Sequence, residues 1–160
     1  MTGLGHVDFQ LHLETETVAQ AHPARPVCAA PQDSIRRILR LLKEENTGAV
    51  MLCEEQRLVG IFTERDVLRV LADDIPLDRP IASVMISNPV TLRPNDTLAR
   101  AIALMSAGGF RRLPIVDRRG KVLGLLKVSG VLRYLVEHFP QVIYTLPPAP
   151  HHHSNARDGA

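Results

Sequence analysis

The sequence lacks the residues on which several protein classes depend. It has no tryptophan, two tyrosines, four phenylalanines and only two cysteines in 160 residues. So few aromatic side chains argue against a surface that stacks on single-stranded nucleic acid. Two cysteines are too few for a disulfide scaffold or for a zinc site made of thiolates, and they are compatible with a reducing compartment.

The sequence also lacks an excess of charge and any long apolar run. Lysine and arginine number 19 against 17 aspartates and glutamates, so the formal net charge is +2. This balance does not give the electrostatic footprint of a nucleic-acid-binding protein. No apolar run approaches the ~18 residues that cross a bilayer, and the N-terminus lacks the basic start and apolar stretch of a signal peptide. We therefore expect a cytoplasmic protein with neither nucleic acid nor membrane as its main partner.

What the sequence does contain is an internal repeat. The segment Pro31–Ser34, with the pattern Pro-x-Asp-Ser, is matched by Pro94–Thr97, which lies 63 positions later. The apolar segment Leu58–Phe62 is matched by Val122–Leu126, which lies 64 positions later. Matching segments in the same order at a nearly constant offset indicate two copies of a unit of about 60 residues.

Each copy has the pattern β-α-β-β-α. An extended piece leads to Pro-x-Asp-Ser or Pro-x-Asp-Thr, which is a good helix start, and two short apolar strands then precede a second helix. One unit alone cannot bury both faces of its sheet, so we expect an α/β (α+β) fold in which two pseudo-symmetric units pack sheet to sheet. The extended pieces, later strands and second helices are predicted at residues 26–30, 49–52, 58–62 and 64–72, and at 89–92, 113–116, 122–126 and 130–138.

The predicted domain boundaries follow from the repeat. Residues 1–14 form an N-terminal tail, 15–76 the first unit, 77–139 the second unit and 140–160 a flexible C-terminal tail. The tail holds three consecutive histidines, His151–His153. Imidazoles can capture a metal ion, but we interpret this run as a solvated tail.

The segment Gly60–Asp66 has residue types that can bind a nucleotide. A strand ends, Thr63 follows, and Asp66 comes three residues later, where a helix starts. An ionised aspartate accepts hydrogen bonds from two donors, which the cis-diol of a ribose supplies, and the free N–H groups of a helix start favour an anion. Thr-x-x-Asp is also close to a capping box, in which both side chains satisfy the helix itself. Spacing alone leaves both interpretations open.

Two arginines, Arg111 and Arg112, come just before the predicted strand at 113–116. The guanidinium group binds phosphate through paired N–H donors. The alternative is a pair of solvated side chains at a strand edge, and the residues alone do not decide between the two.

These features together resemble a tandem pair of CBS (cystathionine β-synthase) domains. One copy carries Gly-x-x-Thr-x-x-Asp and the other carries Arg-Arg-Leu-Pro-Ile-Val-Asp, and the resemblance covers about residues 15–139. It implies β-α-β-β-α units that pair sheet to sheet with two clefts between them. It also implies an adenosine-containing ligand, with AMP, ADP or ATP as the first candidates and S-adenosylmethionine or NAD as further ones.

The resemblance also implies which residues form the nucleotide site. Thr63 and Asp66 would hold the ribose, and Arg111 and Arg112 would reach across to the phosphates. The remaining two positions flank the ribose and line the adenine side. The complete predicted site is Ile61, Thr63, Asp66, Val90, Arg111 and Arg112.

The second copy departs from this pattern. Lys127 stands where Thr63 stands in the first copy, and Gly130 stands where Asp66 stands. Conversely, Asn46 and Thr47 occupy the positions of the two arginines in the first copy. The second cleft therefore lacks both the ribose acceptor and the paired arginines, and we predict one good site per chain.

No motif in the sequence predicts an enzyme. A nucleophile elbow, a Walker loop, an HExxH sequence and paired metal ligands are all missing. The resemblance implies instead a regulatory sensor of energy state or metabolites, which acts allosterically through a dimer or through a regulated protein that the sequence does not identify. The alternative is a dimeric interaction scaffold that needs no nucleotide.

The second helix of each copy offers an apolar face for a homodimer. The candidate residues are Val67, Leu68 and Leu71 in the first copy and Val131, Leu132 and Leu135 in the second. The same residues are equally compatible with a core position. Cys28 lies in a predicted strand and Cys53 comes at the end of another, so we expect both thiols to be buried; a metal or redox role is the alternative.

Overall fold

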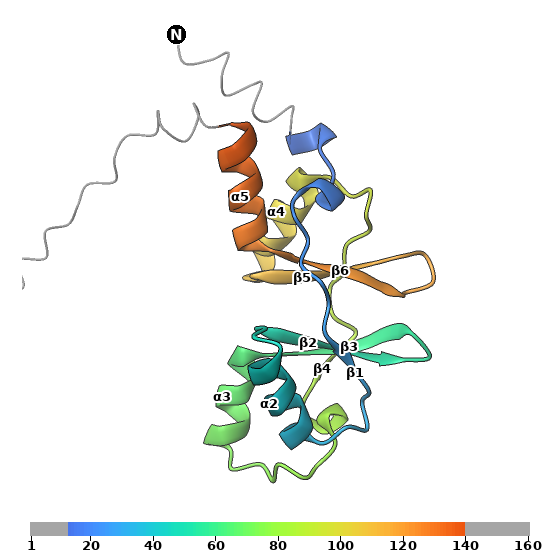
Figure 1. Cartoon of the computed structure of the whole chain (residues 1–160), viewed down its shortest axis with the longest axis vertical. Helices are drawn as coiled ribbons and strands as arrows, with labels where there is room; N and C mark the ends of the chain where they lie inside the picture. Colours follow the sequence, from blue (N-terminus) through green and yellow to red (C-terminus); the bar gives the residue numbers. More distant parts are fainter. Residues whose placement is uncertain (1–12, 140–160) are drawn as a thin grey trace, which may run out of the picture.

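The computed structural model describes residues 13–139 (Figure 1). The tails on either side, including His151–His153, lie outside the described residues. A short 3-10 helix, η1 (Val18–Gln20), comes first. The elements of the first unit follow: β1 (Cys28–Ala29), α2 (Ile35–Glu44), β2 (Ala49–Glu54), β3 (Arg57–Thr63), α3 (Glu64–Ala72), η2 (Ile81–Ser83) and β4 (Ile86–Ser87). Those of the second unit are α4 (Leu98–Gly108), β5 (Arg112–Val116), β6 (Val122–Lys127) and α5 (Val128–His138).

The repeat predicted from the sequence is confirmed as a mixed α+β fold of two similar units. The helix α3 has the predicted bounds, whereas α5 starts at Val128, two residues earlier than predicted. The Val128 N–H donates to the Arg111 carbonyl, so α5 begins directly where β6 ends despite the later glycine. Of the extended piece predicted at 89–92, only Leu92 pairs with the second sheet, through a parallel bridge to Ile115.

The first helix of each unit begins in the same way. The Ser34 hydroxyl accepts from the Arg37 N–H at 3.2 Å, and the Thr97 hydroxyl accepts from the Arg100 N–H at 3.1 Å. The aspartate before each cap accepts a backbone N–H from three residues upstream. Each Pro-x-Asp-Ser/Thr segment thus satisfies both the loop and the orphan donors of the helix start.

The sheets face each other at the centre of the molecule, and the helices cover their outer faces (Figure 1). The first sheet has the strand order β1-β2-β3-β4, with β1 parallel to β2 and the other pairs antiparallel. The second sheet is the antiparallel pair of β5 and β6. Leu125 in β6 forms an antiparallel bridge with Ala24, in the position that β4 takes beside β3.

Three clusters of buried side chains hold this arrangement together. Phe62 is a large, fully buried side chain in the cluster beneath α2 and α3, and Leu126 is buried in the cluster beneath α4 and α5. The third cluster lies between the units and contains Met51 from the first sheet and Leu125 from the second. This contact buries the apolar inner face of each sheet, which a single small unit would leave exposed to solvent.

Each hydrophobic core includes a segment that precedes the other unit in the sequence, so the packing is crossed relative to the order of the chain. Val18 belongs to the core of the second unit, and its N–H donates to the Asp96 carbonyl at 2.9 Å. Ile81 belongs to the core of the first unit, and its N–H donates to the Asp33 carbonyl at 2.7 Å. Each unit therefore takes the segment that precedes the other unit in sequence.

The prediction that both thiols are buried is wrong. Cys28 is exposed and Cys53 is partly exposed. The reason is that β1 has only two residues and lies at the edge of its sheet, so no further strand covers it. Among the helices of residues 13–139, none is long and apolar enough to cross a membrane.

Candidate functional site

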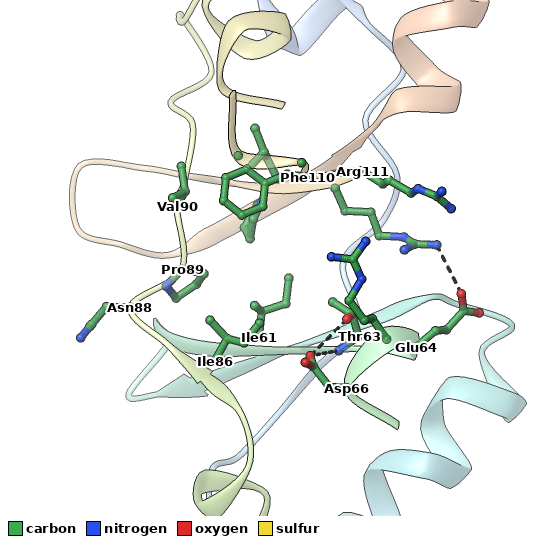
Figure 2. A pocket seen from close by; sticks show the side chains of 16 residues that line it. Ile61, Thr63, Glu64, Asp66, Ile86, Asn88, Pro89, Val90, Phe110 and Arg111 are labelled. Carbon is green, nitrogen blue, oxygen red and sulfur yellow. Dashed lines mark hydrogen bonds and ion pairs between the residues drawn. The ribbon is translucent and has the colours of Figure 1, made fainter. Parts of the chain in front are cut away.

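A pocket of about 330 Å³ opens between the two units (Figure 2). From the first unit it is lined by the end of β3, the start of α3 and the segment 86–90. From the second unit it is lined by residues 108–114, which join α4 to β5. The pocket is therefore complete only when both units are packed together.

The six residues predicted from the sequence all line this pocket. Asp66 lies near its base and Arg111 on the opposite side (Figure 2). The first unit supplies three of them, the connection after β4 supplies one, and the start of β5 supplies the two arginines. They are Ile61, Thr63, Asp66, Val90, Arg111 and Arg112.

Asp66 is the one charged residue among those classed as buried in the described part of the chain, at 4% exposure. Its Oδ2 accepts from the Thr63 backbone N–H at 2.9 Å and from the Thr63 hydroxyl at 3.1 Å. Its Oδ1 accepts from the Arg69 guanidinium at 2.9 Å. The capping interpretation of Thr-x-x-Asp is thus correct, and the same carboxylate faces the pocket.

Capping does not exhaust the bonding capacity of this pair. An ionised carboxylate has about four lone-pair sites, and three donors from the chain use three of them. The Thr63 hydroxyl gives its proton to Asp66 and faces the Asp66 N–H in the capping box, which leaves one lone pair of its oxygen free to accept. Thr63 and Asp66 together can still accept two hydrogen bonds, which is the requirement of a vicinal diol.

The start of α3 is less open to an anion than the sequence suggests. The Glu64 N–H donates to the Gly48 carbonyl at 3.1 Å, and the Thr63 N–H is taken by Asp66. Two of the N–H groups expected to be free are therefore satisfied within the chain. Positive charge in the pocket comes mainly from arginine side chains.

The other end of the pocket is apolar, and sequence reasoning missed most of it. Phe110 and Val90 lie across the pocket from Ile61 and Ile86, with Pro89 beside them (Figure 2). Phe110, Val90 and Ile86 are all exposed, at 38%, 40% and 45%. An apolar slot that remains open to solvent suits a flat, largely apolar ring.

Two glycines at the end of α4 place the Phe110 ring. A Cβ on Gly108 would lie 2.1 Å from that ring, so only glycine leaves room for it. Gly109 ends the helix in the left-handed region with φ +67°. The sequence signal for Phe110 was therefore present, as an aromatic residue directly after Gly-Gly in a chain with few aromatics.

The basic side of the pocket contains an ion pair between the units. Arg112, at the start of β5, reaches Glu64, at the start of α3, with a nitrogen–oxygen distance of 3.8 Å. Its guanidinium lies against Gly48, where an added Cβ would be 2.1 Å away. The Arg112 Nε is buried without a hydrogen-bond partner among the described residues. Arg111 is exposed beside it, so both guanidinium groups retain donors for an anion.

The equivalent position in the second unit is closed. At the start of α5, Lys127 is the N-cap and makes no side-chain capping bond. A Cβ on Gly130 would lie 2.7 Å from the Ala21 carbonyl oxygen, so the backbone of the crossed N-terminal segment fills the space beside it. A carboxylate equivalent to Asp66 does not fit there.

This fold and this pocket agree with the comparisons with known proteins. A model of the CBS domain matches the chain twice, over residues 18–73 and 81–137. The chain therefore belongs to the CBS-domain family and contains a tandem pair of these domains.

Individual relatives support the same assignment. The CBS domain-containing protein YhcV of Bacillus subtilis is 36% identical over 94 residues, which are 58% of this chain and 67% of YhcV. The crystal structure of the CBS domain NE2398 has a TM-score of 0.69 and 28% identity, covering 76% of this chain and 98% of that one. The structure of CBSX2 in complex with AMP has a TM-score of 0.66 and 26% identity, covering 76% and 97%.

Other relatives are longer than this chain. The chain spans 59% of the length of a protein from Methanopyrus kandleri and 28% of the inosine-5'-monophosphate dehydrogenase of Aquifex aeolicus. In the second case the similarity covers a minor part of an enzyme. The similarity to that enzyme does not extend its activity to this chain.

Proposed function

We propose that this chain is a regulatory module that binds one adenine nucleotide in the pocket between its two units. The observation that carries the proposal is the pocket itself, in which an apolar slot, a diol-accepting pair and two arginines follow one another. Adenine, ribose and phosphate require these surfaces in this order. The AMP bound to CBSX2, a relative at 26% identity, supports the same ligand class.

The size of the pocket favours a mononucleotide. A volume of about 330 Å³ is at the small end of the range of roughly 300–1,000 Å³ for small-molecule sites. AMP, ADP and ATP share the part that would be enclosed, while further phosphates would extend past Arg111 towards solvent. We rank S-adenosylmethionine below them because it carries no phosphate for the two arginines, and NAD below them because its second nucleoside exceeds a pocket of about 330 Å³.

Ligand binding would change how the two units pack. Asp66 belongs to the first unit and Arg111 to the second, so one molecule would bridge both. The phosphate would also compete with Glu64 for Arg112, replacing an ion pair between the units with a contact through the ligand. A ligand with differential affinity for two packings shifts their populations, and this is the basis of the allosteric action that we propose.

The output would pass through a homodimer or through a regulated protein in the cytoplasm. The exposed apolar residues of α3 and α5 support the dimer, since Leu68, Leu71, Leu132 and Val136 are 69%, 60%, 55% and 47% exposed. Val131, which the sequence placed on the same face, is buried at 5% and belongs to the core instead. The second candidate is a dimeric scaffold that needs no nucleotide. These four exposed side chains lie outside the pocket lining, so they could form a dimer whether or not the pocket is occupied.

The first test is thermal unfolding with AMP, ADP, ATP, S-adenosylmethionine and NAD. A ligand at ~100 times its Kd stabilises the native state by about 2.7 kcal/mol, which raises Tm by roughly 5–10 °C for a chain of this size. Calorimetry with the best ligand should then give one nucleotide per chain. Cooperative unfolding without a shift for any ligand would favour the scaffold, and two nucleotides per chain would show that the second cleft also binds.

A second test addresses the dimer. Leu68→Glu and Leu132→Glu should each weaken dimerisation about tenfold or more in analytical ultracentrifugation, because each leucine buries apolar area worth roughly 1.5–3 kcal/mol. Leu123→Glu is the matched control, since Leu123 is 47% exposed but lies on β6. A monomeric wild-type protein would contradict the dimer, as would variants that dimerise like the control.

A further inference from the structure

The two thiols of the chain lie on neighbouring parallel strands. Cys28 belongs to β1 and is paired in register with Met51 of β2. Cys53 follows Met51 by two positions, so its side chain leaves the same face of the sheet as that of Cys28. The two thiols are close enough to shift each other's pKa. These are the only two cysteines of the sequence.

The environment of the two thiols is that of a reactive pair. Cys28 is exposed on an edge strand and Cys53 is partly exposed, so a small reagent can reach both. The hydrogen bond from Cys53 lowers the pKa of the Cys28 thiol to about 7, against the smaller opposing effect of burial. The same hydrogen bond, with burial, raises the pKa of Cys53. A lowered pKa raises the share of reactive thiolate at Cys28 near neutral pH.

We propose that Cys28 and Cys53 are a redox-active dithiol, which a peroxide oxidises to an intramolecular disulfide. The Cys28 thiolate attacks one peroxide oxygen, so an S–O bond forms, the O–O bond breaks, and the departing oxide or hydroxide takes up a proton. The Cys53 sulfur then attacks the Cys28 sulfenic acid, so an S–S bond forms and the S–O bond breaks. The hydroxide that leaves takes the Cys53 proton and departs as water.

The order of these steps follows first from exposure, since Cys28 is exposed and Cys53 is only partly exposed, and the coupling between the thiols agrees with it. While Cys28 is a thiolate, its hydrogen bond and its charge keep the proton on Cys53. Oxidation of Cys28 to the sulfenic acid removes that charge, so Cys53 then loses its proton more readily and becomes the resolving nucleophile. Cys28 is therefore the residue that reacts with the peroxide, and Cys53 is the resolving residue that forms the disulfide.

The disulfide would fix the connection between the units. Ala24 is hydrogen bonded to Leu125 of the second unit, and Val27 accepts from the Met51 N–H of the first, so residues 24–28 cross from one unit to the other. A bond from Cys28 to Cys53 would hold the end of this crossing on β2. Oxidation would therefore restrict relative movement of the units at a point outside the nucleotide pocket.

The test is oxidation of the full chain with hydrogen peroxide at neutral pH, followed by alkylation and intact-mass measurement. We expect a monomeric product that has lost two hydrogens, takes up no alkylating reagent, and recovers both thiols with dithiothreitol. Two alkylated cysteines under conditions that oxidise free thiols would overturn the proposal. So would sulfinic acids on both residues, or a disulfide between two chains on a non-reducing gel.

Two single variants separate the roles of the thiols. Cys53→Ser should stop at the Cys28 sulfenic acid, which a dimedone probe traps. Cys28→Ser should leave Cys53 several-fold less reactive to peroxide than Cys28 is in the other variant, because Cys28 is exposed and Cys53 is only partly exposed. Equal reactivity of the two residues would contradict the assignment. Phenylarsine oxide, which requires two adjacent thiols, should bind the reduced wild type and neither variant.

Discussion

The starts of α3 and α5 are equivalent in the fold and opposite in chemistry. At α3, the carboxylate of Asp66 caps the helix, pairs with Arg69 and borders the pocket between the units. At α5, Lys127 gives no side-chain cap, and Gly130 lies against the Ala21 carbonyl. The same backbone turn thus borders a pocket in one unit and packs against the N-terminal segment of the same chain in the other.

This difference shows what the fold requires and what it leaves free. Both units need a strand that runs directly into a helix, and both have it without the same residues. The space beside the helix start is decided by the neighbouring segment, which either approaches closely or leaves a hollow. A binding site therefore needs both the acceptor residue and the room in front of it, and only the first unit combines them among the described residues.

The largest effect on stability is expected when the aspartate found at position 66 in the first unit is placed at the equivalent position 130 of the second unit. Gly130→Asp puts a side chain 2.7 Å from a carbonyl oxygen and brings a carboxylate towards two carbonyls, so the free energy of unfolding should fall by about 2–4 kcal/mol. Urea denaturation measures the change. Ser129→Asp, at the exposed neighbouring position, is the control and should change stability little. Equal stability of the two variants would mean that the second cleft has room for a ribose acceptor.

The next effect concerns the acceptor in the first unit. Asp66→Asn keeps the shape and one carbonyl oxygen but loses the charge, so nucleotide affinity should fall about 10- to 100-fold, since hydrogen bonds to charged groups contribute about 1.5–3 kcal/mol. Calorimetry with AMP measures it. Asp33→Asn is the matched control, because Asp33 also accepts a backbone N–H and pairs with an arginine, outside the pocket. Both variants should lose a few degrees of Tm. Unchanged AMP affinity in Asp66→Asn would mean that Asp66 caps the helix and does not contact the nucleotide.

A smaller effect is expected from the exposed arginine of the pocket. Arg111→Gln should weaken AMP binding about 3- to 10-fold and reduce its salt dependence, because one solvent-exposed donor to the phosphate is lost. Arg118→Gln removes the same charge from the hairpin turn of the second unit, outside the pocket lining, and should leave affinity unchanged. If both substitutions weaken binding equally, the arginine acts through net charge and makes no direct contact.

The smallest effect tests how the N-terminal segment is held on the second unit. Hydrogen bonds from His22 and Arg133 lower the pKa of Glu137 below its ordinary value. A carboxyl with a lowered pKa stabilises the native state fully above about pH 5 and loses this contribution as the pH falls through its folded pKa. The Tm difference between wild type and Glu137→Gln should therefore be present at neutral pH and vanish in acid. Glu44→Gln, on α2 of the first unit, is the matched control for loss of one surface carboxylate.

The fold was largely predictable because its signals are local and repeated. The caps at Ser34 and Thr97, the glycines after α4 and the paired apolar strands each specify a nearby element, and the repeat allowed each to be read twice. The six candidate site residues were named together through the family resemblance, and all six line the pocket. Spacing alone could not separate a capping box from a ligand site, and Asp66 in fact caps the helix and lines the pocket.

The rest depended on contacts that no local pattern encodes. The crossing of residues 16–24 onto the second unit joins segments about 80–120 positions apart, so the filled space beside Gly130 was not visible in the sequence. Phe110 is different, because the Gly-Gly before it was a local signal, but which pocket its ring enters depends on the packing of the two units. The exposure of Cys28 was missed because a two-residue edge strand has the composition of a buried one.

The crossed packing also sets the order in which the protein can be completed during translation. The core of the first unit uses residues between Val27 and Met85, so it can close soon after β4 leaves the ribosome. Val18 and Ala21 emerge earlier than any of these, yet their partners include Tyr134 in the last described helix. We call residues 16–24 the N-terminal arm. At about 5–20 residues per second, roughly 5–25 s pass between the synthesis of this arm and that of Tyr134, with which it packs. During that interval the arm is open to a chaperone or to the second unit of a neighbouring nascent chain, and we expect arm exchange between chains to be the characteristic misassembly of this protein.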